Sequence, residues 1–298
     1  MIQRINMNKI SILSIIIVLA GLFACSPVKK IETTQSTANS IFESGNYTEA
    51  LKLYEQLMTL YKQKGTDVPS NVIENAGISA FKSKAYDKAK EYLTAAFGEN
   101  KTINILMMLI DTYRNIGDVA GLKKLITDNI GFLNNNNKGN EAYTELFKLN
   151  YNAGKYDEAY SNYQNIKTPG IELFADYLEV LNELGKKDEA EKACKEVLAS
   201  YPDNVPALEY LAKSEYNKAE SWYKSEMAKY NKNKNATTYA YLRRDLKKIS
   251  TIFRSARDKF EKLHSIDPEN KTYIKYLKNC YLRLDMKDKA AQMEKLLK

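Results

Sequence analysis

Side chains able to carry out acid, base or nucleophilic chemistry are scarce in this sequence. His264 is the single histidine, and it stands just before "SIDPEN" with no serine-plus-acid or metal-ligand pattern near it. Catalysis of this kind needs several such groups in one place. The glycines are isolated ones at helical bends, so they form no phosphate-binding loop. The sequence therefore predicts a protein that is not an enzyme and has no cofactor, metal or small-molecule substrate.

Positive charge, in contrast, is concentrated in one part of the chain. Residues 205–298 carry 22 Lys and Arg against 12 Asp and Glu, whereas residues 25–204 carry 21 against 25. A patch of this kind suits nucleic acid, an anionic membrane or an acidic protein segment. A solvated, lysine-rich helix face is the alternative reading. The candidate anion-binding residues are Lys232, Lys234, Arg243, Arg244, Lys247 and Lys248.

The first 24 residues have the pattern of an export signal. Arg4 and Lys9 precede an apolar run from Ile10 to Phe23, which is shorter than the roughly 20 residues that a membrane span needs. "LFAC" at Leu22–Cys25 resembles the lipobox of bacterial lipoproteins. This resemblance implies cleavage before Cys25, lipid attachment to its sulfur and a tether over residues 25–33. An uncleaved membrane anchor is the alternative.

The same resemblance implies a location. Ser26, not aspartate, follows the cysteine, and no acidic run comes after it. By analogy with lipoprotein sorting, we expect a lipid-anchored protein of the cell envelope, on the outer membrane and facing the periplasm. Export also argues against nucleic acid as a partner.

Cys194 and Cys280 stand within helical core patterns, "EKACKEV" and "YLKNCYL". Two cysteines in a chain of this length do not make a disulfide framework. We expect each to be a small buried hydrophobe, with a bridge between the two as the alternative.

One short pattern recurs along the chain. "GNYTEALKLYEQL" at Gly45, "GKYDEAYSNYQNI" at Gly154 and "GKKDEAEKACKEVL" at Gly185 share a turn residue followed five places later by alanine. The alanines of the full set are Ala50, Ala89, Ala159, Ala190 and Ala290, with Leu122 in a weaker copy. Helices that precede the turns carry contact residues at Ala38, Gly77, Ile110, Phe147, Leu178 and Lys278. Small side chains let two antiparallel helices approach closely, so the pattern predicts stacked helical hairpins.

The pattern resembles the tetratricopeptide repeat, and Ala190, Val197, Tyr201 and Pro202 match its signatures best. The resemblance implies an all-α solenoid of stacked helix-turn-helix units. We expect such repeats over residues 34–204 and a terminal one over 271–298. Residues 205–270 depart from this spacing and predict either a degenerate repeat or an elongated basic hairpin. We favour two helices of roughly 26 residues each, about 39 Å long.

The first helices of such units line the concave face, which holds extended peptides or partner helices. The peptide-binding candidates on this face are Arg114, Lys148, Tyr151, Asn152, Lys213, Tyr216, Asn217, Lys275 and Asn279. Lys275 with Asn279 resembles half of the clamp by which some tetratricopeptide domains grip a C-terminal carboxylate. The sequence thus favours a lipid-anchored scaffold or adaptor of the envelope that binds protein or peptide partners. The alternative function is binding of a membrane surface or anionic envelope polymer through the basic hairpin at 229–262.

Lipidation at Cys25 is directly testable. Cys25→Ala removes the sulfur that would take the lipid, so we expect a heavier, unprocessed precursor that fails to incorporate labelled palmitate. Labelling of the variant equal to that of the unaltered protein would contradict the lipoprotein prediction.

Overall fold

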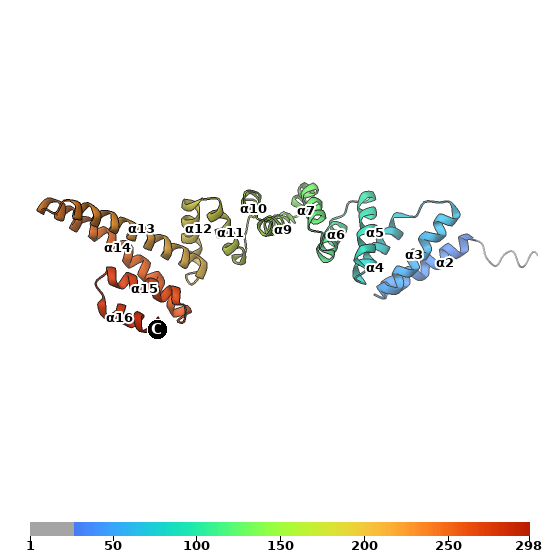
Figure 1. Ribbon diagram of the computed structural model, residues 1–298. Helices are drawn as coiled ribbons and strands as arrows, with labels where there is room; N and C mark the ends of the chain where they lie inside the picture. Colours follow the sequence, from blue (N-terminus) through green and yellow to red (C-terminus); the bar gives the residue numbers. More distant parts are fainter. Residues whose placement is uncertain (1–26) are drawn as a thin grey trace, which may run out of the picture. The chain divides into compact units, whose positions relative to one another are not determined.

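The computed structural model describes residues 27–298, and this part of the chain is helical throughout, with no strand (Figure 1). Two compact units divide between Ala142 and Tyr143, inside α9 (Gly139–Asn152). The helices of the first unit are α2 (Pro27–Glu43), α3 (Tyr47–Lys64), α4 (Ser70–Lys82), α5 (Tyr86–Glu99), α6 (Ile103–Ile116), α7 (Val119–Asp128) and α8 (Ile130–Asn135). Those of the second unit, after α9, are α10 (Tyr156–Tyr163), the short 3₁₀ helix η1 (Ile171–Leu173), α11 (Phe174–Glu183), α12 (Lys187–Ser200), α13 (Val205–Lys232), α14 (Ala236–Ile266), α15 (Lys271–Arg283) and α16 (Lys287–Leu296).

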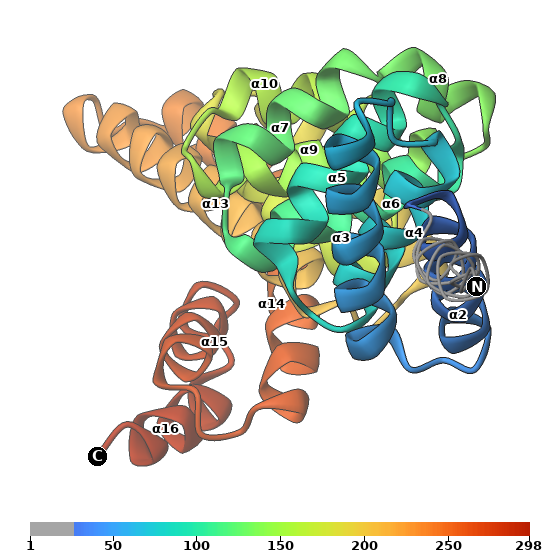
Figure 2. The same cartoon turned by 90° about the vertical axis from the view of Figure 1, so that its right-hand side faces the viewer.

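The expected all-α architecture of repeated helical hairpins is confirmed. Consecutive helices such as α4 and α5, or α15 and α16, pack against each other as pairs (Figure 2). Each unit is therefore a series of hairpins, and a hairpin buries its apolar side only against its neighbours.

A left-handed residue closes the first helix of each short hairpin. Gly185 has a φ of 67°, and its N–H donates to the Asn182 carbonyl at 3.0 Å. The next N–H, that of Lys186, donates to the Leu181 carbonyl at 2.8 Å. This pair of bonds satisfies two carbonyls that the helix end would otherwise leave without partners. Glycine suits the position because a side chain disfavours positive φ.

The recurring alanines lie where the two helices of a hairpin meet. Ala50, Ala89, Ala159 and Ala190 are 0 % exposed, and Ala290 is 4 % exposed. Their first-helix counterparts are buried too, except Lys278, which is half-buried and forms an ion pair with Glu294 of α16 at 2.8 Å. A polar contact thus replaces the apolar one in the last hairpin.

Gly77 shows how close one crossing is. A β-carbon at this position of α4 would lie 2.8 Å from the Leu93 Cδ2 and 3.1 Å from the Leu93 backbone nitrogen on α5. Contacts that short force a neighbour to move, so glycine in the middle of α4 is explained by packing and not by a bend in the helix.

The structure adds one turn that the sequence pattern missed and shortens the expected tether. Asn137, with a φ of 59°, closes α8, and Ala142 follows five residues later at 4 % exposure. Residues 27–33, expected as part of a tether, instead form the first two turns of α2, because Ile31 is buried at 5 % exposure. Residues 1–26, which include Cys25, lie outside the described part.

The elongated hairpin is present. α13 has 28 residues and α14 has 31, against 10 to 14 residues for α11, α12, α15 and α16. Asn235 caps the start of α14: its side chain accepts from the Thr238 N–H at 2.9 Å, and the Thr238 hydroxyl accepts from the Asn235 N–H at 3.1 Å. This capping box ends the polar break between the two helices.

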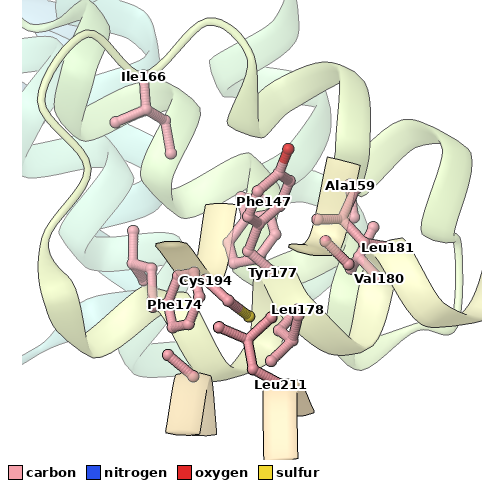
Figure 3. Packing of buried hydrophobic residues seen from close by; sticks show 13 residues of the cluster. Phe147, Ala159, Ile166, Phe174, Tyr177, Leu178, Val180, Leu181, Cys194 and Leu211 are labelled. Atoms are coloured by element: carbon pink, nitrogen blue, oxygen red, sulfur yellow. The ribbon is translucent and has the colours of Figure 1, made fainter. Parts of the chain in front are cut away.

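Two apolar clusters hold the second unit together. In the first, Phe147, Tyr177 and Cys194 lie among the buried side chains of α9 to α13 (Figure 3). In the second, Phe253 and Phe260 of α14 pack with residues of α13, α15 and α16. By packing α13 and α15, the clusters fix the positions of the two helices that carry five of the nine peptide-binding candidates.

The turn geometry generates a stability prediction. Lys84 occupies the left-handed position of the α4–α5 turn with a φ of 63°. Lys84→Gly removes the side-chain conflict, so we expect the free energy of unfolding to rise by about 0.5–1 kcal/mol. Gly45→Ala tests the opposite change, because it adds a side chain at the matching turn, where φ is 80°. It should lower the free energy of unfolding by about 1 kcal/mol. Urea unfolding measures both, and a loss of stability in Lys84→Gly would refute the explanation.

Candidate functional site

No metal-binding cluster is found among residues 27–298. No group of three or more His, Cys, Asp or Glu side chains there is arranged to hold a metal ion. The Nδ1 of His264 is buried and has no hydrogen-bond partner in the described part.

Cys194 and Cys280 are both buried free thiols, as expected. Burial raises the pKa of each thiol to about 12, because the thiolate is poorly solvated in an apolar core. A thiol of this kind is unreactive at neutral pH, so both residues act as core side chains.

The candidates on the earlier first helices are exposed or already paired with other side chains of their own unit. Arg114, in the first unit, is exposed and forms an ion pair with Asp111 on its own helix. In the second unit, Lys148 and Asn152 of α9 are exposed. Tyr151 donates its hydroxyl to Glu179 of α11 at 2.8 Å, and this bond raises its pKa to about 12. Tyr151 therefore links α9 to α11, and its hydroxyl is already hydrogen-bonded within the protein.

Of the candidates on α13 and α15, Tyr216 and Asn279 meet. The rings of Tyr216 and Tyr276 lie edge to face at 4.9 Å, so the two helices are in contact there. Burial raises the pKa of Tyr216, and a hydrogen bond with Asn279 opposes that shift. Lys213 is paired with Glu209 on its own helix, while Asn217 is exposed.

A cleft of about 480 Å³ lies beside this contact. Its lining consists of Lys271, Thr272, Lys275, Tyr276, Asn279 and Leu297. Lys275 is exposed and Asn279 is half-buried, so a cation and an amide border an aromatic floor. Small clefts with an apolar floor and a few polar groups suit a short peptide segment. Sequence reasoning found two of these residues but missed Tyr276, since its ring looks like ordinary repeat core in the sequence.

The comparisons with known proteins bear on the repeats. Residues 40–68 and residues 179–204 match models of the tetratricopeptide repeat. The chain contains tetratricopeptide repeats. No curated protein matches it.

Several solved structures resemble the chain at low sequence identity. YrrB, described as a TPR protein with an unusual peptide-binding site, is 18 % identical over 62 % of this chain and 97 % of its own, with a TM-score of 0.43. The C-terminal part of a TPR repeat-containing protein from Cytophaga hutchinsonii is 14 % identical over 88 % of this chain and 93 % of its own, with a TM-score of 0.46. A TPR repeats protein from Bacteroides fragilis is 17 % identical over 85 % of this chain and 98 % of its own, with a TM-score of 0.38.

Among residues 27–298, no helix combines the length and the apolar character needed to cross a membrane.

The basic candidates lie on the elongated hairpin, outside the regular tetratricopeptide hairpins, and they are not equivalent. Lys232, Lys234, Arg243, Lys247 and Lys248 are exposed, and none forms an ion pair with a described residue. Arg244 instead binds Asp245 through two hydrogen bonds of 3.0 and 3.2 Å. Its charge is therefore neutralised, which a list of basic residues does not reveal.

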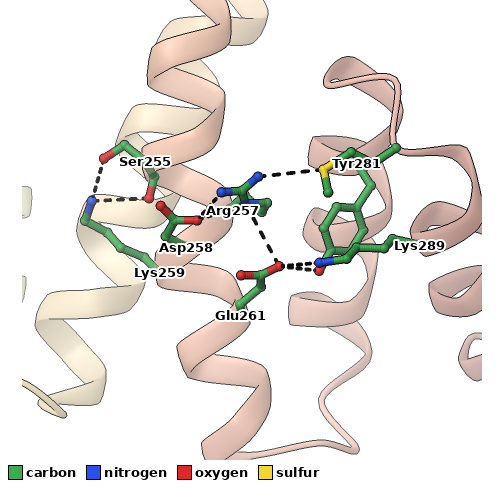
Figure 4. A network of polar contacts seen from close by, with 8 residues as sticks. Ser255, Arg257, Asp258, Lys259, Glu261, Tyr281 and Lys289 are labelled. Atoms are coloured by element: carbon green, nitrogen blue, oxygen red, sulfur yellow. Dashed lines mark hydrogen bonds and ion pairs between the residues drawn. The ribbon is translucent and has the colours of Figure 1, made fainter.

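Asp245 faces the core side of α14, and its side chain is 12 % exposed. The Arg244 guanidinium holds the pKa of this carboxyl below its usual value, with smaller contributions from Lys248 and Lys229. The neighbouring residues Arg257 and Asp258 repeat the arrangement thirteen residues further along α14, but there the carboxyl is 61 % exposed (Figure 4).

These two pairs make a matched experiment. Because the folded pKa of Asp245 is lowered, the stabilisation is present above the unfolded pKa of about 4 and is lost as the pH falls through the folded value. We expect Asp245→Asn to lower the urea midpoint at neutral pH and to have a smaller effect in acid. Asp258→Asn should change little at either pH, since its carboxyl is screened by water. Equal losses in the two variants would contradict the role given to burial.

Proposed function

We propose that this chain is a non-catalytic scaffold of the bacterial cell envelope that binds a protein or peptide partner. The tetratricopeptide repeats support the general role, because stacked hairpins present first helices as a binding surface. The observation that supports the proposal most is the cleft on α15, which the candidates Lys275 and Asn279 line beside the contact between Tyr276 and Tyr216 of α13.

The cleft has the chemistry of a peptide site. Tyr276 is stacked on Phe260 at 4.6 Å and touches Tyr216, so its ring is held in place before any partner arrives. A fixed aromatic floor lowers the entropy cost of binding. Lys275 and Asn279 can bind a carboxylate and a backbone amide of an extended segment. The preferred partner is therefore a peptide segment with an acidic group beside an apolar side chain.

The anchor and the location are part of the same proposal. The resemblance of "LFAC" to a lipobox supports attachment through lipid at Cys25. The residue after it, Ser26, supports the outer membrane, with the repeats facing the periplasm. An anchored scaffold of this kind would gather its partner at the membrane surface.

Site-specific crosslinking in intact cells tests the cleft. A photoreactive amino acid replaces Lys275 at the edge of the cleft, or Lys192 on the exposed side of α12 as the control position. We expect a defined protein adduct from position 275 only. Adding Thr272→Trp, which fills the cleft from an exposed position, should abolish that adduct while the circular dichroism stays helical. An adduct that forms equally from position 192, or that survives Thr272→Trp, would refute the cleft as the binding site.

A further inference from the structure

The outer side of α14 carries a row of exposed side chains that the peptide-binding proposal does not use. Tyr239, Arg243, Lys247 and Arg254 are all exposed. At 100° per residue they fall within about 80° of one another around the helix, and they extend over about 22 Å of its length. We call these four residues the basic row.

The three cations of the basic row are separate from the hairpin's internal contacts, whereas the ring of Tyr239 lies against that of Tyr230 on α13, with centroids 5.9 Å apart. The buried residues of α14 include Leu242, Ile249, Phe253 and Phe260, and their directions centre about 120° away from the basic row by the same periodicity. No cation of the basic row forms an ion pair with a residue of the described chain. Its charges are therefore available to a partner.

The acidic residues near the tip point elsewhere. Glu226 pairs with Lys229 at 2.6 Å, and Asp245 pairs with Arg244. Both carboxylates line a cleft of about 530 Å³ on the other flank of the hairpin, together with Tyr230 and Tyr241. An acidic peptide entering that cleft would meet two carboxylates, so the cleft does not suit an anion. The free cations lie instead on another side of α14.

Exposed aromatic side chains accompany the free cations at the tip. Tyr239 is 54 % exposed and Tyr241 is 55 % exposed. Lys232 and Lys234 lie beside them, at the break between α13 and α14. Tyrosine is favoured at the boundary between water and hydrocarbon, because its ring is apolar and its hydroxyl stays hydrated. Lysine and arginine next to it bind anionic lipid headgroups.

We propose that the basic row and the tip of the α13–α14 hairpin bind the surface of an anionic lipid membrane. A row of charges along a helix suits a flat surface better than a pocket does. Tyr239 and Tyr241 stay more than half exposed, although Tyr239 contacts Tyr230 and Tyr241 contacts Arg244. This surface is distinct from the peptide cleft on α15, so either one could fail without the other.

Vesicle sedimentation tests the proposal on the chain from Ser26 to Lys298, which contains every described helix and both apolar clusters of the second unit. The probes are vesicles of phosphatidylcholine with phosphatidylglycerol, and vesicles of phosphatidylcholine alone. We expect binding to the anionic vesicles only, with release as salt rises. Replacing Arg243, Lys247 and Arg254 by Gln should weaken that binding by about tenfold or more.

The matched control removes the same charge elsewhere. Lys187, Lys192 and Lys195 of α12 are exposed, and changing these three to Gln should alter vesicle binding by less than about twofold. Tyr239→Ser should reduce the binding that remains at high salt. Circular dichroism confirms that each variant is folded, which the exposed positions favour.

Three results would overturn the proposal. One is an unaltered protein that does not bind anionic vesicles, and another is an equal loss in the basic-row and α12 variants. The third is binding to polyglutamate but not to vesicles, which would assign the surface to an acidic protein. Thr272→Trp should leave vesicle binding unchanged, so failure of the peptide cleft and failure of the membrane surface are distinguishable.

Discussion

The close approach of two helices within each hairpin is the constraint on which the rest of this structure depends. It requires a residue with a small side chain at the crossing and a chain that reverses in two or three residues. Ala190, fully buried, meets the first requirement, and Gly185, with its positive φ, meets the second. Because the two stand five residues apart, the reversal and the crossing are set by one short segment. Each copy of that segment makes one hairpin, and the stacking of hairpins then makes the core.

Ion pairs between charged side chains contribute to helix packing around the elongated α13–α14 hairpin. Lys259 of α14 binds Glu215 of α13 at 2.9 Å, and Arg283 of α15 binds Glu220 of α13 at 2.7 Å. In the network of Figure 4, Glu261 of α14 accepts the hydroxyl of Tyr281 at 2.7 Å. Acidic side chains are thereby used for contacts between helices. The surplus of basic residues in this part of the chain is consequently left on the outside.

The sequence predicted those features that depend on neighbours a few residues apart. The spacing of turn residue and alanine, with leucine in one copy, predicted six hairpins. The apolar periods on both sides of the polar break within residues 205–266 favoured the long one. Asn137 escaped notice because asparagine stands where most of the other turns have glycine, although asparagine also tolerates positive φ. α2 extends into the expected tether because Ile31 finds an apolar environment, and that contact is not visible in a polar stretch of sequence.

The candidate site was harder to predict, since it depends on partners that are distant in sequence. Tyr216 and Tyr276 are sixty residues apart in the chain, and only the return of the long hairpin brings their rings together. The sequence does not distinguish Arg244 from the neighbouring cations, whereas the structure shows it paired with Asp245. The placement of Lys275 and Asn279 one helical turn apart could be read from the sequence. The Tyr276 ring that lines the cleft beside them could not be predicted in this way.

Burial is uneven along the long hairpin. On α13 the last buried residue is Ala219, and on α14 the first is Leu242, so the stretch between them is held by helix hydrogen bonds, half-buried rings and ion pairs. Such a stretch opens with a small free energy, while residues near Ala256 open only when the second apolar cluster comes apart. We therefore expect amide hydrogens near the tip to exchange with solvent through fraying, and those near Ala256 through cooperative unfolding. We therefore expect the tip of the hairpin to unfold locally at a surface while the base stays folded in the second apolar cluster.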